Sequence, residues 1–377
     1  MKITGAVLTR MGVSAPYAQS APIEFLELDL ADPGPTEVLV RIEAAGLCHS
    51  DLSVVNGSRP RPMPMLLGHE AAGIVEAVGA EVQDLTPGQR VVTVFLPRCE
   101  NCDACRTGGR LPCATGSLSN AAGDLPGGGS RLSREGERVN HHLGVSGFAT
   151  HAVVDRRSVV PVGADVPPAI AAVLGCAVLT GGGAVKNAGA LQPGQDLIVV
   201  GLGGVGMAAL LTGLSITAAA GGRVIGVDAN PEKLEAALAM GAHEAFSSAD
   251  ALDRGLRAAV VVEAAGHPRA FETAVALTAP GGVTVTAGLP APGATATIEP
   301  LGITAEARSI VGCYLGSAVP ARDIPFYEQL WREGRLPVEK LTTVTMPLDQ
   351  LNEALDVLHE GRAIRQMISF DGVEADG

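Results

Sequence analysis

The chain has 377 residues, a formal net charge of −13 and a sequence pI near 5.1. This length accommodates two domains with separate cores, and the 47% of hydrophobic residues is typical of a globular protein. The negative charge argues against a nucleic-acid partner, because phosphate backbones attract positively charged surfaces.

The N-terminal third alternates short strands with Pro and Gly turns. We expect strands at residues 37–42, 73–78 and 89–95, which together form an all-β pattern. Residues 114–147 are rich in glycine and show little periodicity, so we expect a long loop there.

From about residue 178 the pattern changes to alternating strands and helices. This spacing predicts βαβ units on a parallel sheet. Residues 197–222 carry no charge and are long enough to cross a bilayer, but their glycines favour a buried strand, turn and helix. The expected strands are 197–200, 224–227, 259–263, 283–287 and 367–370, and the expected helices are 205–219, 231–240, 268–277, 323–333 and 351–359.

Four cysteines are clustered at a spacing typical of a structural zinc site. Disulfides or core thiols are the alternatives, but the residues around these cysteines are polar and no secretory leader is evident. We therefore expect cytoplasmic localisation and a closed tetrahedral zinc site. The four predicted ligands are Cys99, Cys102, Cys105 and Cys113.

A second candidate zinc site combines Cys48, His69 and Cys176. Each is weak evidence alone, since a buried cysteine is usually a small hydrophobic residue. Acidic residues accompany them, however, because Asp51 follows Cys48 closely and Glu70 follows His69. Two thiolates and one imidazole form a known catalytic zinc set whose fourth position stays open.

A glycine-rich turn follows the expected strand 197–200 and opens a helix, as dinucleotide binding requires. Its residues are Gly201, Gly203, Gly204, Val205 and Gly206. Asp228 ends the next strand, where it would accept hydrogen bonds from the adenosine ribose and repel a 2′-phosphate. NAD is therefore favoured over NADP. The alternative is that Asp228 only precedes a helix capped by Asn230.

Four motifs occur together: residues 46–51 (GLCHSD), residues 68–73 (GHEAAG), the four cysteines and residues 201–206 (GLGGVG). In this combination the chain resembles the zinc-dependent alcohol dehydrogenases of the medium-chain dehydrogenase/reductase superfamily. The resemblance implies a GroES-like, mostly-β catalytic domain at 1–177 and 322–377, and a Rossmann domain with a doubly wound parallel sheet at 178–321.

The resemblance also implies roles for single residues. Cys48, His69 and Cys176 would hold a catalytic zinc, Asp51 would orient the histidine ligand, and Glu70 would lie beside the metal. Ser50 would accept the alcohol proton, although a serine there can also be a backbone cap. Further residues implied to contact the cofactor are His49, Lys233 and Arg365.

Two positions depart from the family pattern. The usual relay histidine is replaced by Ser53, so proton release would go to solvent or to another base, and the usual pyrophosphate-binding arginine is replaced by His49. The implied pocket residues are Phe95, Leu118, His142, Leu143, Leu289 and Tyr314. His142 and Tyr314 could bind a second substrate oxygen, or His142 could simply pack against the loop. Arg59 and Arg61 suggest an anionic substrate, or are solvated surface residues.

The expected function is reversible hydride transfer between a primary or aromatic alcohol and NAD in an enzyme that binds two zinc ions per chain. Thiol-dependent formaldehyde dehydrogenase, a nicotinoprotein alcohol dehydrogenase and a zinc- and nucleotide-binding sensor without catalysis are the alternatives. The expected partner is a small-molecule alcohol or aldehyde, without nucleic acid or membrane. By resemblance we expect a homodimer, with residues 283–287 pairing across a two-fold axis.

Overall fold

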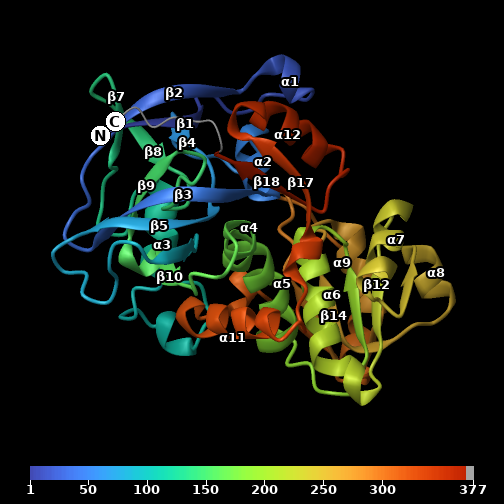
Figure 1. Ribbon diagram of the computed structural model, residues 1–377. Coiled ribbons are helices and arrows are strands. Elements are labelled where there is room, and N and C mark those ends of the chain that lie inside the picture. Colours follow the sequence, from blue (N-terminus) through green and yellow to red (C-terminus); the bar gives the residue numbers. More distant parts are fainter. Residues whose placement is uncertain (371–377) are drawn as a thin grey trace. The chain divides into compact units, whose positions relative to one another are not determined.

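The computed structural model describes residues 1–370, which divide into two compact units (Figure 1). The chain returns to the first unit at Thr342, later than the predicted residue 322. The first unit comprises Met1–Thr107, Pro112–Cys176 and the chain from Thr342 onward, and the second comprises Gly108–Leu111 and Ala177–Leu341.

Helix α11 (Pro320–Arg332), which the sequence analysis placed in the first unit, packs within the second. Its Tyr327 is fully buried against Gly182, where a Cβ atom would come within 2.7 Å of the tyrosine ring. Its buried Asp323 accepts hydrogen bonds from Val319 N at 2.9 Å and Asn187 Nδ2 at 3.3 Å. These contacts fix the helix to residues of the second unit, and the periodicity of the sequence does not predict them.

The first unit is built from a small closed barrel and a larger sheet. The barrel joins β1 (Lys2–Leu8), β2 (Ile23–Leu30), β7 (Leu132–Arg134), β8 (Glu137–His141) and β4 (Met65–Leu66). The sheet runs in the order β10 (Val159–Pro161), β6 (Arg90–Thr93), β5 (Glu70–Val78), β3 (Glu37–Leu47), β18 (Arg365–Ser369) and β17 (Thr342–Pro347), with β9 (His151–Asp155) also paired to β3.

Its helices are short and lie around these strands. They are α1 (Tyr17–Ser20), α2 (His49–Val55), α3 (Ala114–Ala122), α4 (Pro168–Val173) and α12 (Leu351–His359). Apolar residues of β3 such as Val38, Val40 and Ile42 form the core together with Leu351 and Leu355 of α12. Figure 1 shows the blue β3 and the red β18 as neighbours, so segments far apart in sequence meet in one sheet.

The expected loop at residues 114–147 is more regular than predicted. It contains α3, β7 and β8, which are separated by glycine turns. Gly123 ends α3 at φ +71°, and the side chains of Arg131 and Glu37 form an ion pair at 2.6 Å that anchors the segment to β3. The strands have three and five residues, which is too short to produce a visible alternation in the sequence.

The second unit contains a parallel sheet, as predicted, with six strands where the sequence analysis expected four. Its order is β13 (Glu244–Phe246), β12 (Val224–Val227), β11 (Leu197–Val200), β14 (Ala258–Glu263), β15 (Thr278–Thr286) and β16 (Ser309–Gly312). The described helices are α5 (Leu179–Gly183), α6 (Gly204–Thr217), α7 (Pro231–Met240), α8 (Ser248–Asp253), α9 (Pro268–Ala276), α10 (Pro300–Ala305) and α11. The strand order reverses at β11, which lies between β12 and β14, and such a reversal places a ligand crevice at the carboxyl ends of the strands.

The prediction that residues 283–287 form the strand that pairs with another subunit is wrong, because both edges of this strand are occupied within the sheet. That segment overlaps β15, which is already hydrogen-bonded to β14 on one side and β16 on the other. The edge strand at that side is β16.

The uncharged segment 197–222 folds as strand β11, a glycine turn and helix α6, which agrees with the predicted buried unit. A different helical stretch, Pro168–Ala188, is long and apolar enough to cross a membrane, but 89% of it is buried within the protein. Its apolar side chains are therefore covered by the fold, as in a core helix.

Candidate metal centres and nucleotide site

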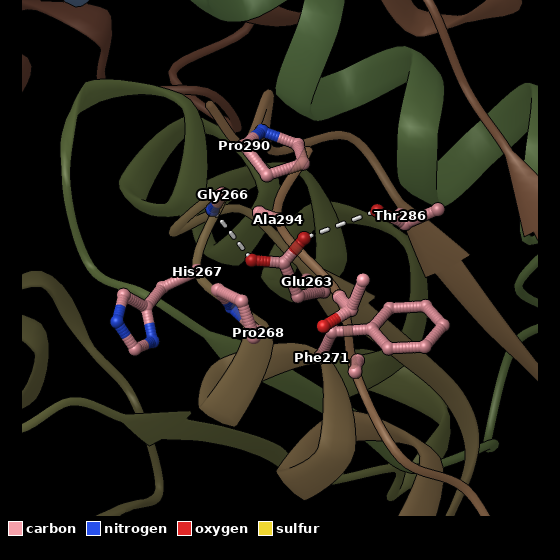
Figure 2. A pocket seen from close by; sticks show the side chains of 10 residues that line it. Glu263, Gly266, His267, Pro268, Phe271, Thr286, Pro290 and Ala294 are labelled. Atoms are coloured by element: carbon pink, nitrogen blue, oxygen red, sulfur yellow. Dashed lines mark hydrogen bonds between the residues drawn. The ribbon is translucent and has the colours of Figure 1, made fainter. Parts of the chain in front are cut away.

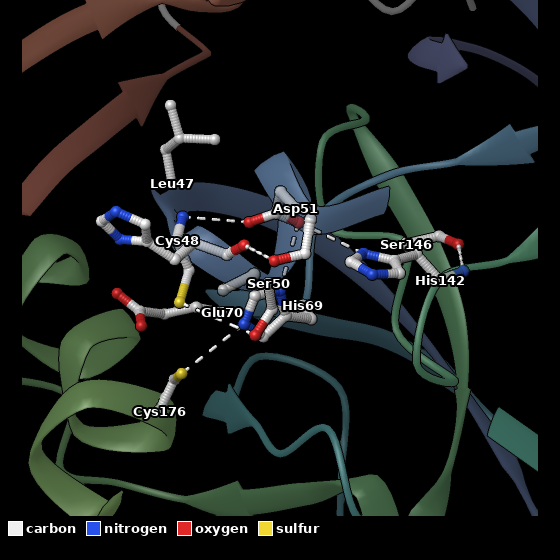
Figure 3. A network of polar contacts seen from close by, with 12 residues as sticks. Leu47, Cys48, Ser50, Asp51, His69, Glu70, His142, Ser146 and Cys176 are labelled. Atoms are coloured by element: carbon white, nitrogen blue, oxygen red, sulfur yellow. Dashed lines mark hydrogen bonds and ion pairs between the residues drawn. The ribbon is translucent and has the colours of Figure 1, made fainter. Parts of the chain in front are cut away.

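Three potential zinc ligands converge in the first unit (Figure 3). Cys48 follows β3 and caps α2, His69 directly precedes β5, and Cys176 lies in a π-helical turn after α4. Their ligand atoms all lie within 4.8 Å of one another, and Cys176 Sγ is 3.5 Å from His69 Nε2. Tetrahedral zinc requires ligand separations of about 3.5–3.8 Å, so this donor set fits the ion.

Asp51 fixes the orientation of His69. Its Oδ1 lies 3.1 Å from His69 Nδ1, and its Oδ2 accepts a hydrogen bond of 3.0 Å from Cys48 N. Burial alone would raise the pKa of Asp51, but the charges and hydrogen bonds of His69 and His142 outweigh it and hold the pKa at about 2. An ionised carboxylate only accepts, so His69 carries a proton on Nδ1, and Nε2 is the ring nitrogen that faces the thiols and would bind the metal.

The two thiols differ in acidity, because the contact between them raises the pKa of Cys176 and lowers that of Cys48. A hydrogen bond from Cys176 lowers the pKa of Cys48 well below its ordinary value, against the effect of burial. This favours the thiolate form, which is the form that binds zinc.

Glu70 and Arg365 form a buried pair beside this site. Arg365 Nη2 lies 3.3 Å from Glu70 Oε2, and Arg365 Nη1 donates to Leu47 O at 3.1 Å. Burial raises the pKa of Glu70 to about 7, although the charge of Arg365 opposes this. Gly46 faces Glu70 across β3 and β5, and a Cβ atom there would lie 2.0 Å from Glu70 Oε1. Arg365, predicted to contact cofactor phosphate, is thus 4% exposed and engaged with Glu70.

The serines of α2 differ in their surroundings. Ser50 is half-buried, with Oγ 4.0 Å from Cys48 Sγ. Ser53, at the usual position of the relay histidine, donates from Oγ to His49 O at 2.6 Å. That hydroxyl is therefore part of a helix backbone contact, while the side chain of His49 is exposed at the start of α2.

The predicted pocket residues are distributed over both units. Phe95 and His142 each meet the His69 ring edge-on, with centroid distances of 5.6 and 5.4 Å, and Leu143 is buried next to His142. By contrast, Leu118 on α3 is 72% exposed. Leu289 and Tyr314 belong to the second unit, where Leu289 is 48% exposed.

The four clustered cysteines form a second convergent set in the first unit. Their sulfurs lie within 4.8 Å of one another, with 3.9 Å between Cys99 Sγ and Cys105 Sγ. Cys113 Sγ accepts N–H groups from Cys99 at 3.3 Å and from Gly116, at the start of α3, at 3.4 Å. All cysteines in the chain are free of disulfides. Donor type, separation and N–H···S bonds all fit zinc, and no two of these four sulfurs are joined by a disulfide.

The glycine turn of the second unit lies at the carboxyl end of β11. Gly201 has φ +92°, and a Cβ atom on Gly206 would lie 1.8 Å from Gly201 O, so this tight turn requires glycine. A Cβ atom on Gly203, the N-cap of α6, would meet nothing within 4 Å, which leaves the helix start open to a phosphate. This cradle fits a dinucleotide.

Asp228 stabilises the same turn. Its Oδ2 accepts from Leu202 N at 2.7 Å and its Oδ1 accepts from Asn230 N at 2.9 Å. Each oxygen retains a second lone pair that a ribose hydroxyl could use. Asn230 also caps α7 by accepting from Glu232 N, and Lys233 is half-buried on that helix. Both predicted roles of this region, ribose acceptor and helix entry, are therefore compatible.

A pocket of about 230 Å³ lies at the carboxyl ends of β14 and β15 (Figure 2). The carboxylate of the buried Glu263 faces it and is held by Ala265 N at 2.8 Å, Gly266 N at 2.6 Å and Thr286 Oγ1 at 3.1 Å. Sequence reasoning did not identify Glu263, although an acidic residue that ends an apolar strand is a detectable signal. The remaining lining includes Pro268, Phe271 and Pro290.

Comparison with known proteins agrees with this geometry. The family model described as "Alcohol dehydrogenase GroES-like domain" matches residues 34–164, and the one described as "Zinc-binding dehydrogenase" matches residues 204–331. A Mycobacterium tuberculosis protein, provisionally named alcohol dehydrogenase D, is 36% identical over 98% of this chain and 100% of its own length.

Two further relatives have more specific names. An Escherichia coli protein named S-(hydroxymethyl)glutathione dehydrogenase is 30% identical over 94% of this chain and 98% of its own length. The crystal structure of benzyl alcohol dehydrogenase from Acinetobacter calcoaceticus is 30% identical, with a TM-score of 0.88 over 98% of this chain and 99% of that one. The predicted fold class, a GroES-like domain combined with a Rossmann-type domain, is confirmed.

Proposed function

The chain belongs to the zinc-dependent alcohol dehydrogenases of the medium-chain dehydrogenase/reductase superfamily, and on this premise we propose that it transfers a hydride reversibly between a primary or aromatic alcohol and NAD. The observation that carries the proposal is the convergence of Cys48, His69 and Cys176, with Asp51 holding the imidazole. Benzyl alcohol is the first candidate substrate, because a relative of known structure is a benzyl alcohol dehydrogenase.

The three ligands would hold one zinc ion, and Cys99, Cys102, Cys105 and Cys113 would hold a second. The catalytic ion supplies Lewis acidity that lowers the pKa of an alcohol hydroxyl, and NAD supplies the hydride acceptor. Asp51 keeps the lone pair of His69 directed at the metal position. By the role that the family resemblance gives it, Ser50 would accept the proton of the substrate hydroxyl while passing its own proton to the cofactor ribose. The buried Phe95 and Leu143 help to exclude water.

For the cofactor, the proposal rests on the glycine turn and Asp228. The helix start at Gly203 meets the pyrophosphate, and Asp228 accepts hydrogen bonds from the adenosine ribose. Its negative charge disfavours NADP. Lys233, His49 and Arg365 complete the proposed cofactor contacts, and Arg365 would have to divide its donors between phosphate and Glu70.

The proposed assembly is a homodimer in the cytoplasm that acts on small molecules. The edge strand β16 offers unpaired backbone groups, which a second copy could use to continue the sheet. Size-exclusion chromatography with light scattering measures the oligomeric state, and a monomer would contradict this part of the proposal.

The first test measures NADH formation by purified, zinc-replete protein with primary, secondary, aromatic and ω-carboxylated alcohols, without added thiol. We expect turnover of benzyl alcohol and its loss in Cys48→Ser and Cys176→Ser. Turnover that is unchanged in both variants, or a complete lack of turnover on the panel, would contradict the proposed function.

A second candidate is thiol-dependent formaldehyde oxidation, which the E. coli relative's name favours. Formaldehyde oxidation that requires added glutathione or another low-molecular-weight thiol would support it. Turnover of benzyl alcohol without any thiol, combined with no thiol-dependent formaldehyde oxidation, would exclude it.

A further inference from the structure

Asp51 is shared by two buried imidazoles. Oδ1 lies 3.1 Å from Nδ1 of His69 and 3.2 Å from Nδ1 of His142. All three side chains are at most 1% exposed, and the two rings are nearly perpendicular, at 87°. Figure 3 shows His142 on the side of Asp51 that is remote from Cys176.

The position of His142 is fixed by its own backbone contacts. His142 N donates to Ser146 Oγ at 3.1 Å, and that hydroxyl donates to Leu66 O at 2.9 Å. The following residue, Leu143, is buried at φ +53°. This tight turn holds the His142 ring against the carboxylate.

The chemistry of the contact follows from the acceptor. An ionised carboxylate can only accept, so both imidazoles must present Nδ1–H to the same oxygen. The His142 contact has hydrogen-bond distance, but its Nδ1 makes no hydrogen bond of regular geometry, so it is the weaker of the two contacts. Two N–H groups facing one oxygen share its negative charge, so the hydrogen bond from His69 is weaker than it would be alone.

We propose that His142 is a positioning residue for the catalytic zinc site, which withdraws part of the Asp51 charge from His69 and so sets how strongly His69 holds the metal. This rests on the proposed function, because it assumes zinc on His69 Nε2. It differs from both roles considered for His142 above, substrate contact and packing against the loop. Without the second donor, the full carboxylate charge falls on His69, whose Nε2 becomes a stronger zinc ligand.

The test is the rate of zinc release to a chromophoric chelator, without turnover. The catalytic phase is identified as the one missing from Cys176→Ser. Loss of a hydrogen-bond partner of a zinc ligand changes metal affinity by about 10- to 100-fold. His142→Phe removes only the weaker donor to Asp51, so it should slow zinc release by about 3- to 10-fold. His142→Asn, whose amide N–H can replace Nδ1–H, should restore the wild-type rate.

Controls separate this role from a structural one. His141→Gln alters the neighbouring buried imidazole, which accepts from Arg131 N and does not meet Asp51, and should release zinc at the wild-type rate. Cobalt-substituted His142→Phe should show shifted ligand-field bands, which a packing defect alone would not produce. If His142→Phe does not fold, His142→Gln serves in its place. The glutamine amide lies at the Nε2 position, so this variant also lacks a donor at the position of Nδ1.

Release at or above the wild-type rate in His142→Phe, or equal slowing in His142→Asn, would overturn the proposal. Zinc content separates this failure from failure of the proposed function. A wild-type protein that holds only the four-cysteine zinc would refute the catalytic zinc itself, whereas full zinc content with unaltered release would refute only the role of His142.

Discussion

Replacement of Asp228 by asparagine should reverse part of the preference for NAD. The substitution preserves size but removes the charge and one of the two acceptor oxygens. In the structure both oxygens are used, by Leu202 N at 2.7 Å and Asn230 N at 2.9 Å, so the amide NH₂ would face one of these N–H groups. The turn is therefore perturbed together with the ribose contact.

The magnitude follows from the charged acceptor that is lost. A hydrogen bond to a charged group contributes about 1.5–3 kcal/mol, which corresponds to a rise of about 10- to 150-fold in the Kd of NAD. The Kd of NADP should change less or decrease, because the repulsion of its 2′-phosphate is removed. Isothermal titration calorimetry with each cofactor measures both values.

Asp196→Asn is the matched control. It causes the same change in net charge, but Asp196 precedes β11 at the opposite end of the strand, where it pairs with the exposed Arg223 at 2.7 Å. The reasoning is refuted if the Kd of NAD in Asp228→Asn stays within about twofold of the wild-type value, or if Asp196→Asn weakens NAD equally.

Three further perturbations test other parts of the structure. Burial lowers the pKa of His141 to about 3, below the ordinary value near 6.5, so the stability that neutral His141 provides above about pH 6.5 is lost as the pH falls. The unfolding free energy measured in urea should be about 2 kcal/mol smaller at pH 5 than at pH 7, and the difference should be smaller in His141→Gln. Gly46→Ala places a Cβ atom 2.0 Å from Glu70 Oε1 and should cost about 1–3 kcal/mol of unfolding free energy with reduced turnover, and an unchanged unfolding midpoint would contradict this packing argument. Cys105→Ser should lower the zinc content by one ion per chain, as measured by mass spectrometry of the metal, and an unaltered content would show that Cys105 is not a ligand.

Much of the fold was predictable because its signals are local. The strands at 197–200 and 224–227, and the helix at 231–240 with its Asn230 cap and Pro231, have the predicted bounds. Apolar runs, a capping residue and glycine turns determine these elements without help from distant residues. The convergence of Cys48, His69 and Cys176 followed from family resemblance, since their separation along the chain alone predicts no contact.

The remaining features depend on tertiary contacts that leave little trace in the sequence. Helix α11 packs within the second unit through Asp323 and Tyr327, whose partners lie far away in the chain. His142 was expected either to bind a second substrate oxygen or to pack against the loop, and the contact with Asp51 beside the turn at Leu143 was not foreseen. Likewise, β15 proved to be an interior strand because β16, too short to show a pattern, lies beyond it.

Strand β18 has a bearing on how the protein is made. It lies between β3 and β17, and it carries Arg365, which pairs with Glu70 beside the metal ligands. A ribosome therefore completes the entire parallel sheet of the second unit before it supplies this interior strand. The larger sheet of the first unit can therefore be completed only after the second unit has been synthesised in full.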